Sequence, residues 1–241
     1  MNYFFITGTS RGIGKAIAEQ LLADENNFVF GIARTNTISH ERFSFHALDL
    51  SDNAAVSGWE FPVLKDAGKI CLVNNAGIIG SVKHAGKMQA DEIASAFHVN
   101  LIAPAILTNT FLKNYENFTG KQVIINVSSG AGKNPIDGWS VYCATKAGLD
   151  MYTKTIVEEL KIDGKRHIYV FAVAPGIVDT SMQDQIRSGS SENFSRIDQF
   201  IAYKNTDQLA APGLVAGKFL AILELPEKFK DVLFSVKDIQ S

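Results

Sequence analysis

Short runs of β-branched and aromatic residues recur along the whole chain, and most of them are continuously apolar rather than alternating with polar residues. Strands buried on both faces have this pattern, because helices cover both sides of a parallel sheet. The runs therefore predict about seven strands of such a sheet. They lie at residues 3–7, 28–33, 43–48, 70–73, 122–127, 168–173 and 232–236.

Segments with apolar residues at helical spacing lie between these runs, at 14–23, 91–114, 142–160 and 211–223. Alternating strands and helices imply right-handed crossovers, which predict an α/β fold with a doubly wound parallel sheet of the Rossmann type and helices on both faces. With 241 residues, 46% of them hydrophobic, the chain suits one domain better than two small ones. We expect a single domain over residues 1–241.

The segment 184–200 interrupts the pattern with polar and small residues. In an open α/β sheet, a long excursion after the carboxyl end of a strand usually covers the crevice in which a ligand binds. We therefore expect residues 181–205 to form a lid over a substrate.

Composition excludes several classes of function. The formal net charge is -2 and the cations are scattered, so a nucleic-acid partner is not favoured. The start of the chain lacks a basic leader and no apolar run reaches the ~18–20 residues of a membrane span, so we expect a cytoplasmic protein without a membrane partner. Two cysteines are too few for a disulfide scaffold, and the five histidines form no ligand cluster, so no metal site is expected.

The first predicted strand leads directly into the stretch TGTSRGIG, residues 7–14, and then into a helix. Its three glycines allow a tight turn, a close backbone approach to a pyrophosphate and close packing of the helix on the strand. The spacing differs from the commonest dinucleotide fingerprint, and no G-K-[S/T] follows as in a P-loop; an ordinary turn is the alternative. The cofactor contacts expected in this stretch are Gly8, Ser10, Arg11, Gly12, Ile13 and Gly14.

Arg34 follows the second predicted strand, twenty residues after Gly14. An acidic residue there would hydrogen-bond the ribose 2′-hydroxyl of NAD, whereas a cation attracts the 2′-phosphate of NADP. Arg11 adds a second positive charge, so NADP(H) is the favoured cofactor. The alternative is that both arginines are solvated surface charges.

Tyr142 and Lys146 are four residues apart in a predicted helix, so they share one face. A cation beside a tyrosine stabilises the phenolate and lowers a pKa that is ordinarily about 10. Ser129 lies thirteen residues before Tyr142, where its hydroxyl can hydrogen-bond a carbonyl oxygen that gains negative charge. These residues favour carbonyl reduction, with Tyr142 as the proton donor; a packed tyrosine beside a solvated lysine is the alternative.

Six motifs occur together in one order: T-G-x-x-x-G-I-G at 7–14, NNAG at 74–77, Asn100, SS at 128–129, YCATK at 142–146 and PG at 175–176. In this combination the chain resembles the short-chain dehydrogenase/reductase family. Within it, the stretches at 128–148 and 174–188 are most similar to the sepiapterin reductase branch, and especially to bacterial members described as benzil reductases. The resemblance implies an NADP-dependent oxidoreductase that acts on a small-molecule carbonyl and commonly dimerises.

The resemblance also assigns roles to single residues. It places the active-site serine at Ser129 rather than Ser128, and a fourth catalytic member at Asn100, at the start of a helix, where it holds a water that links Lys146 to solvent. A helix cap is the alternative for Asn100, and turn residues for the serines. Further cofactor contacts implied by resemblance are Asp49, Leu50, Asn75, Ala76, Gly77, Tyr142, Lys146, Pro175, Gly176, Ile177 and Thr180.

Apolar residues surround the expected carbonyl site, at Ile79, Ala131, Trp139, Ile177, Met182 and Phe200. Such walls suit an aromatic or bulky hydrophobic ketone or diketone, with Ser129, Trp139, Tyr142 and Met182 as substrate contacts. The acidic residue that anchors the pterin in sepiapterin reductases is replaced by Ser235, and Asp238 is expected to lie too far along the chain to substitute for it. Reduction of a pterin side chain is therefore the second choice.

The helices at 103–114 and 144–160 carry apolar residues on more than one stripe. A helix that is apolar on two sides often has a second partner, so we expect a homodimer through these helices. The residues concerned are Ile106, Leu107, Phe111, Met151 and Ile156. A non-catalytic NADP-binding sensor is an alternative of another class, since a fold does not imply catalysis; an epimerase or dehydratase is disfavoured by the short carboxyl-terminal region.

Overall fold

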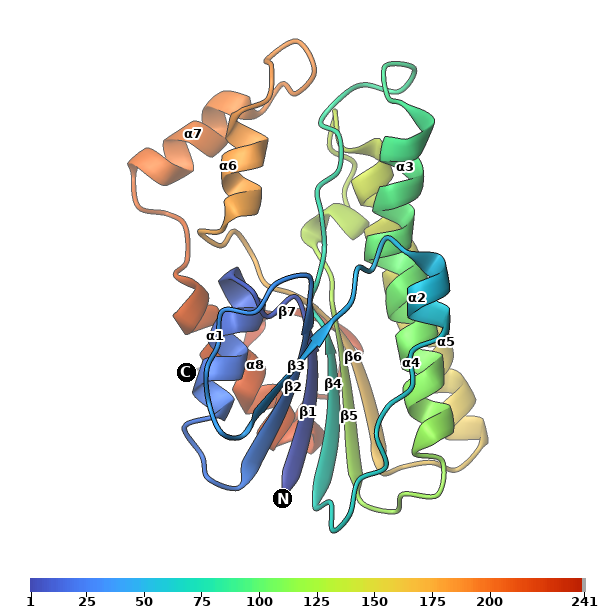
Figure 1. Ribbon diagram of the computed structural model, residues 1–241. Helices are drawn as coiled ribbons and strands as arrows, with labels where there is room; N and C mark the ends of the chain where they lie inside the picture. Colours follow the sequence, from blue (N-terminus) through green and yellow to red (C-terminus); the bar gives the residue numbers. More distant parts are fainter. Residues whose placement is uncertain (240–241) are drawn as a thin grey trace.

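A computed structural model describes residues 1–239 and contains one seven-stranded sheet whose strand pairs are all parallel. The strand order is β3-β2-β1-β4-β5-β6-β7 (Figure 1). The single-domain, doubly wound fold predicted from the apolar runs is therefore confirmed. The strands are β1 Asn2–Thr7, β2 Asn27–Ala33, β3 Phe43–Ala47, β4 Lys69–Asn74, β5 Lys121–Val127, β6 Ile168–Ala174 and β7 Leu233–Ser235.

The helices include the four predicted segments and three short helices that the sequence pattern did not indicate, α2, α6 and α7. The α-helices are α1 Gly12–Leu21, α2 Asn53–Ser57, α3 Ala90–Phe97, α4 Ala103–Asn114, α5 Ser140–Ile162, α6 Ser181–Arg187, α7 Ile197–Asn205 and α8 Pro212–Glu224. One π-helical turn, η1 His98–Ile102, and three 3₁₀ turns, η2 Gly130–Gly132, η3 Pro226–Lys228 and η4 Val236–Asp238, complete the set.

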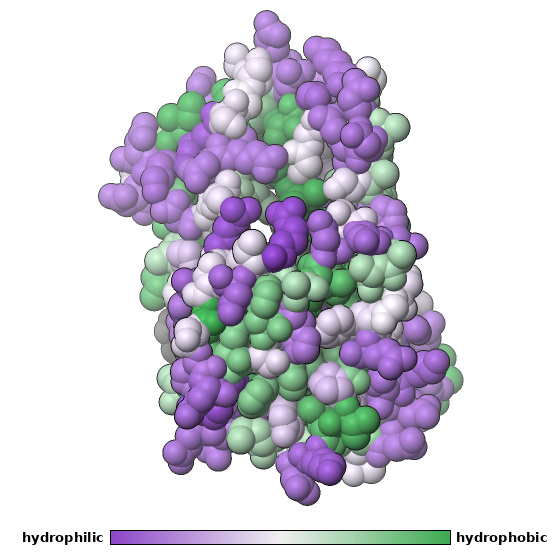
Figure 2. Space-filling view, in the orientation of Figure 1, coloured by the Kyte–Doolittle hydropathy of each residue, from purple (hydrophilic) through white to green (hydrophobic). Residues whose placement is uncertain are grey.

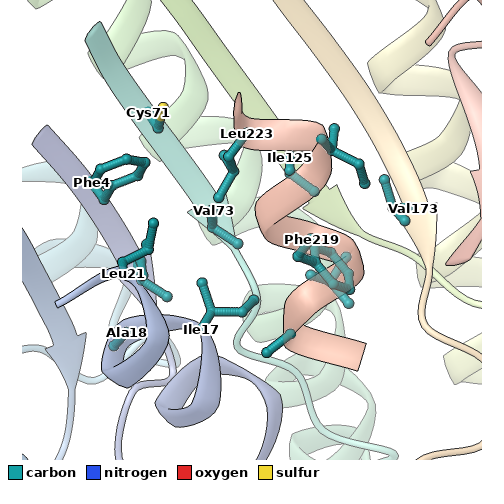
Figure 3. Close-up of a cluster of buried hydrophobic side chains, with 14 of the residues drawn as sticks. Phe4, Ile17, Ala18, Leu21, Cys71, Val73, Ile125, Val173, Phe219 and Leu223 are labelled. Carbon is teal, nitrogen blue, oxygen red and sulfur yellow. The ribbon is translucent and has the colours of Figure 1, made fainter. Parts of the chain in front are cut away.

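Helices α1 and α8 cover one face of the sheet. Ile17 and Leu21 of α1 and Phe219 of α8 point toward strand residues such as Val73 and Ile125 (Figure 3). All five side chains are almost completely buried. Removing this much apolar surface from water stabilises the fold, by roughly 1.5–3 kcal/mol for each large side chain.

The opposite face of the sheet packs against α2, α4 and α5. Alternate strand residues, such as Phe5 and Leu72, contact Leu107 and Phe111 of α4 and Ile156 of α5 in this second cluster. Successive strand residues point to opposite faces, so both faces need apolar residues and the strands become continuously apolar. This arrangement explains the pattern from which the sheet was predicted.

Helices α3 and α4 form one continuous helix through the π-helical turn η1. Asn100 lies within that turn, in the middle of the helix rather than at a helix start, so both the predicted position and the cap alternative are wrong. By length and composition alone, the helix Ala90–Asn114 could cross a membrane. The sequence pattern did not indicate this, because the helix contains no uninterrupted apolar run of that length. Leu107 and Phe111 are fully buried against the sheet, so this helix uses its apolar face within the fold.

Strands β1 and β4 lie side by side in the centre of the sheet, although β2 and β3 come between them in the chain. The chain therefore crosses from one half of the sheet to the other after β3. Ligands of open α/β sheets bind beyond the carboxyl ends of the strands at such a switch point. The glycine-rich stretch follows β1, and the NNAG motif begins at the end of β4, so both lie at this place.

Candidate active site

A cavity of about 1360 Å³ runs along the carboxyl edge of the sheet. In the space-filling view the molecule is hollowed at mid-height, between the α6–α7 segment and the body that contains the sheet (Figure 2). The cavity is lined by all the substrate residues predicted from the sequence and by every predicted cofactor residue except Gly14. Asn100, expected as a catalytic residue, does not line it.

The glycine-rich turn closes tightly over the end of β4. Gly8 and Gly12 have φ of +76° and +61°, a backbone conformation that residues other than glycine rarely adopt. A Cβ at Gly14 would lie 2.3 Å from Asn75 Nδ2 and 2.5 Å from the Gly8 carbonyl oxygen. Gly14 therefore acts through packing of α1 on the turn, one of the roles expected for it, and contributes no surface to the cavity.

The amino end of α1 has no side-chain cap and no acidic residue in its first turn. Its first backbone N–H groups have no partner within the helix, and together with the helix dipole they favour a bound anion. The N–H groups lie beside a cavity lined by Ser10, Arg11 and Gly12. The residues present thus fit the pyrophosphate of a dinucleotide cofactor.

Thr7, which sequence reasoning did not single out, joins the ends of β1 and β4. Its Oγ1 accepts hydrogen bonds from the backbone N–H groups of Asn75 and Ala76, both at 3.0 Å. The Asn75 side chain in turn donates to the Thr7 carbonyl oxygen at 2.9 Å. A threonine at the first position of the T-G-x-x-x-G-I-G motif was the available signal, and its buried hydroxyl holds the two cofactor-side segments together.

Arg11 and Arg34 are exposed and line the same end of the cavity as Asp49 and Leu50. Asp49 accepts hydrogen bonds from the Ser51 backbone N–H and hydroxyl, which hold the pKa of its carboxyl below the usual value, and Arg34 adds a weaker effect. Asp49 therefore stays charged and turned toward Ser51. The two guanidinium groups provide the positive charge at this end.

Tyr142 and Lys146 lie on the face of α5 that meets the end of β5, and both are more than 90% buried. Lys146 Nζ donates a 2.7 Å hydrogen bond to the Val127 carbonyl oxygen and lies 5.7 Å from the centre of the Tyr142 ring. The hydroxyl of Ser129 is hydrogen-bonded to Tyr142 and also accepts from the Ala131 N–H at 3.2 Å. Ser129, Tyr142 and Lys146 are therefore together, as the spacing predicted.

Burial has the largest effect on the pKa values of Tyr142 and Lys146. It raises the pKa of Tyr142 to about 12, against a smaller opposite effect of the hydrogen bond with Ser129. Burial also lowers the pKa of Lys146 to about 8, against the opposite effect of the Asp150 carboxylate. The predicted lowering of the Tyr142 pKa by Lys146 is wrong for the chain without cofactor: the pKa is raised because desolvation penalises the phenolate, and the lowering effect comes from Ser129. At neutral pH Tyr142 carries its proton and most of Lys146 is charged.

Asn100 connects the loop after β4 to α5. Its Nδ2 donates to the Ile78 carbonyl oxygen at 2.8 Å and to Thr145 Oγ1 at 3.3 Å, and its Oδ1 accepts from the Ile78 N–H at 2.9 Å. The side chain is completely buried. A Cβ at Gly77 would lie 3.3 Å from Asn100 Oδ1 and 3.7 Å from Lys146 Nζ, so the loop passes closely over both residues. Asn100 is therefore placed to position this loop rather than to touch a ligand.

Aromatic side chains enclose the far end of the cavity. Trp139 stacks on Phe194, with ring centres 5.2 Å apart, and meets Phe200 and Tyr142 edge-on at 5.4 and 5.8 Å. Phe194 and Phe200 belong to the segment 181–205, so this segment packs directly against the loop after β5. Ile79 and Met182 complete the apolar lining.

Two further contacts attach the segment 181–205 to the loop after β5. The backbone N–H and hydroxyl of Ser195 donate to the Asp137 carboxylate at 2.6 and 3.0 Å. Gly138 has a φ of +73°, and a Cβ there would lie 2.3 Å from the Asn193 carbonyl oxygen. The two segments therefore fit together backbone against backbone.

Ser235 and Asp238 both line the cavity, so the expectation that Asp238 lies too far away is wrong. The short turn η4 folds back, and Asp238 accepts a 2.8 Å hydrogen bond from the Ser235 N–H. The carboxylate thereby lies beside the residue that occupies the predicted anchor position. A sequence offset could not show this, because the return of the chain comes from a capping box.

Within residues 1–239, no group of three or more histidine, cysteine and acidic side chains is placed to hold a metal ion. Cys71 is buried in β4, and its thiol pKa is raised by burial to about 12; Cys143 is partly exposed on α5. Both thiols are free.

The family profile described as short chain dehydrogenase matches residues 2–191, and the chain belongs to this family. It is an oxidoreductase with carbonyl reductase activity of this family's type, which uses a nicotinamide cofactor and acts on a small molecule. The cavity at the switch point and the uncapped amino end of α1 are the parts of the chain that suit such a cofactor.

Relatives named for an activity agree with the branch expected from the motifs. The chain is 40% identical over 240 residues to benzil reductase ((S)-benzoin forming) of Bacillus cereus, covering 94% of this chain and 96% of that one. The protein of the same name in Bacillus subtilis (strain 168) is 38% identical over 231 residues, covering 93% and 94%. Sepiapterin reductase of Rattus norvegicus is 28% identical over 244 residues, covering 91% and 90%.

Among solved structures, the YIR035C short chain dehydrogenase/reductase of Saccharomyces cerevisiae matches with a TM-score of 0.85. It is 26% identical in sequence, and the match covers 99% of this chain and 97% of that one. The match extends over the whole sheet and the segment 181–205, so the complete architecture is that of the family.

Proposed function

We propose that the protein is an NADPH-dependent carbonyl reductase of aromatic or bulky hydrophobic ketones and diketones, with Tyr142 as the proton donor. The observation that carries this proposal is the position of Ser129, Tyr142 and Lys146 on one wall of the cavity, between the glycine-rich turn and the aromatic cluster around Trp139. The names of the two bacterial relatives point to the same class of substrate.

The bound cofactor supplies the hydride. Around it, Ser129 polarises the carbonyl by donating a hydrogen bond to the oxygen as negative charge develops there. Tyr142 is protonated at neutral pH and gives its proton to this oxygen. Lys146 is charged and fixed by the Val127 carbonyl oxygen. It stabilises the resulting phenolate and would hold the ribose of the bound cofactor.

Water is kept from the reaction by the aromatic cluster and the segment 181–205, which acts as the lid. Trp139 and Met182 form the wall against which the substrate's hydrophobic groups lie. A closed apolar site strengthens the hydrogen bonds made to the developing charge. Asn100 contributes indirectly, because it holds the loop after β4 and Thr145 in place.

NADP(H) is preferred to NAD(H) because two cations line the cavity where the second strand ends. A 2′-phosphate gains charge-assisted hydrogen bonds from Arg11 and Arg34, whereas the nearby acid, Asp49, is occupied by Ser51. The Asp49 carboxylate is therefore not placed to bind the ribose as the acidic residue of NAD enzymes does.

Pterin reduction is the second candidate, and the position of Asp238 favours it more than the sequence did. Its carboxylate lies on the cavity wall next to Ser235 and could pair with the amino group of a pterin. The hydrogen bond from the Ser235 N–H competes for that carboxylate, and the aromatic lining suits a diketone without a charged anchor.

A homodimer and a cytoplasmic location complete the proposal. Of the five residues on which the dimer was predicted, Leu107, Phe111 and Ile156 are buried in the chain's own core, so the argument from their stripe is wrong. Met151, which is 62% exposed on α5, still supports an apolar contact with a second copy. The two free cysteines suit a reducing compartment.

The test follows NADPH absorbance with benzil and with sepiapterin as substrates, for the wild type and for Tyr142→Phe. We expect benzil to be reduced faster than sepiapterin, and the variant to lose at least a hundredfold in kcat while still binding NADPH, measured by fluorescence. Near wild-type turnover by the variant would remove Tyr142 as the proton donor. Much faster turnover of sepiapterin would select the second candidate.

A further inference from the structure

Three consecutive residues at the end of β5 each contact a different residue of α5. The carbonyl oxygen of Val127 accepts from Lys146, the hydroxyl of Ser128 donates to the carboxylate of Asp150, and Ser129 is hydrogen-bonded to Tyr142. The α5 residues are 142, 146 and 150, one helical turn apart on one face. Two of these contacts concern the reacting groups, and the third, Ser128–Asp150, has no role in the chemistry described above.

Asp150 is unusual because it is a carboxylate buried between α5 and the end of β5. It is only 6% exposed, and burying a carboxylate is strongly unfavourable unless it is paired and hydrogen-bonded. The next contact between the same two elements, Asn126 Nδ2 to Thr153 Oγ1 at 2.9 Å, joins β5 to α5 with neutral groups. Attachment of strand to helix therefore does not need a charge, which points to a function for the charge itself.

The turn after Ser129 packs on α5 at the same place. A Cβ at Gly132 would lie 2.9 Å from the Lys146 carbonyl carbon and 3.0 Å from Asp150 Oδ2. Asp150 also lines the cavity, next to Lys146. The carboxylate is thus built into the junction where the β5 end, the turn η2 and the reacting face of α5 meet.

We propose that Asp150, held by Ser128, is a positioning residue for carbonyl reduction, which keeps Lys146 positively charged in its buried setting and fixes the β5 end opposite Tyr142. This inference rests on the proposed function. It adds the hydrogen-bonded pair Ser128–Asp150 to the Ser129–Tyr142–Lys146 group.

The charges around this pair are few. Lys146 faces Tyr142 and Asp150 on its own helix, the carbonyl of Val127 from β5, and the neutral Gly77 and Asn100. Asp150 interacts with Lys146, with Lys154 on α5 and with Lys133 after η2. The Asp150 carboxylate raises the pKa of Lys146 against the effect of burial. Burial raises the pKa of the Asp150 carboxyl above its usual value, and the hydrogen bond from Ser128 and the charges of Lys133, Lys146 and Lys154 oppose this rise.

The test measures kcat/KM for diketone reduction with NADPH between pH 6 and 9.5. Asp150→Asn keeps the shape and the acceptor for Ser128 but removes the charge. We expect near wild-type rates at pH 6, and the alkaline fall in rate to begin about one pH unit lower, so that the rate at pH 8.5 drops about tenfold. Asp150→Glu, which keeps the charge, is expected to keep the wild-type position of the alkaline limb.

Two further variants separate the charge from the hydrogen bond. Ser128→Ala leaves the carboxylate in place, and we expect a lower kcat without a shift of the alkaline limb. Thr153→Val removes the neutral contact one turn further along α5, and we expect a lower Tm with an unchanged pH profile. An alkaline limb that stays in place in Asp150→Asn would overturn the proposal.

A second readout does not depend on the substrate. Between pH 7 and 9.5 the stability of the protein is expected to rise as Lys146 loses its proton, and in Asp150→Asn this rise should begin about one pH unit lower. If the wild type reduces no carbonyl, the proposed function fails, while the stability profiles still show whether Asp150 holds the charge of Lys146. Coincident stability profiles would remove Asp150 from that role.

Discussion

Burial of the Lys146 ammonium has a cost that a pH series can measure. The pKa of Lys146 is lowered from its usual 10.5 to about 8 in the folded chain, because the charged form is desolvated. Between these two values the unfolded chain binds more protons than the folded one. Stability must therefore increase as the pH rises through this interval, and the penalty is fully present below pH 8.

The expected size follows from the two pKa values. Integration over the proton uptake gives a rise in the free energy of unfolding of about 2 kcal/mol between pH 7 and pH 9.5. For a chain of this length that corresponds to roughly 4–8 °C in Tm. The matched variant is Lys146→Met, which keeps the length of the side chain but cannot titrate.

Other ionisable groups also change the stability at these pH values, and their contributions must cancel between the wild type and the variant. The pKa of Cys71 is raised from 9.0 to about 12, so its thiol stabilises the fold at neutral pH and this contribution is lost as the pH rises above 9. Tyr142 and Tyr152, both raised to about 12, act likewise above pH 10. These groups are present in both proteins, so the difference between wild type and variant isolates Lys146.

The assay is urea unfolding followed by circular dichroism at half-unit pH steps. We expect the free energy of unfolding of the wild type to rise by about 2 kcal/mol relative to Lys146→Met between pH 7 and 9.5. The variant also loses the hydrogen bond to Val127, which the wild type can donate both as the ammonium and as the neutral amine. Parallel pH profiles would refute the reasoning, since they would mean that the ammonium is not desolvated by the fold.

Three further predictions test the cofactor end and the lid. Arg34→Glu should raise KM for NADPH at least tenfold more than KM for NADH in steady-state kinetics; equal effects would contradict the assignment of NADP. Gly14→Ala should lower stability by about 3 kcal/mol in urea unfolding because its Cβ meets Asn75 and Gly8, whereas Gly130→Ala, with nothing within 4 Å, should change it by less than about 1 kcal/mol. Gly138→Ala should displace Asn193 and lower kcat/KM for diketones at least fivefold, whereas Gly164→Ala, which shares the positive φ but meets open space, should leave it unchanged; equal activity of the two variants would exclude the contact as a determinant of the site.

The sheet and the long helices could be predicted because their signals are local. Most strands are continuously apolar because both of their faces are covered, and α5 keeps one buried stripe from Tyr142 to Leu160. Helices α2, α6 and α7 were missed because they are only five to nine residues long, so they show too few turns for a period. The position of Asn100 was misjudged for another reason: it was expected at a helix start but lies in a π-helical turn, which leaves no mark in composition.

At the site, spacing predicted proximity but not environment. The four-residue separation of Tyr142 and Lys146 shows that they share a face, yet the direction of their pKa values depends on burial, which only the assembled sheet and loops provide. Thr7 and Asp150 were missed for the same reason, since their partners Asn75 and Ser128 are 68 and 22 residues away. Asp238 was misplaced because a capping box reverses the chain after Ser235.

The attachment of the lid, by Asp137 to Ser195 and by Gly138 against Asn193, involves none of the groups that handle hydride or proton. If this segment is the lid that we propose, substitutions in it are expected to alter which molecules enter and how quickly products leave, while β5 and α5 retain the reacting geometry. A change of substrate range is therefore expected to need substitutions only within residues 181–205, and not in the reacting group.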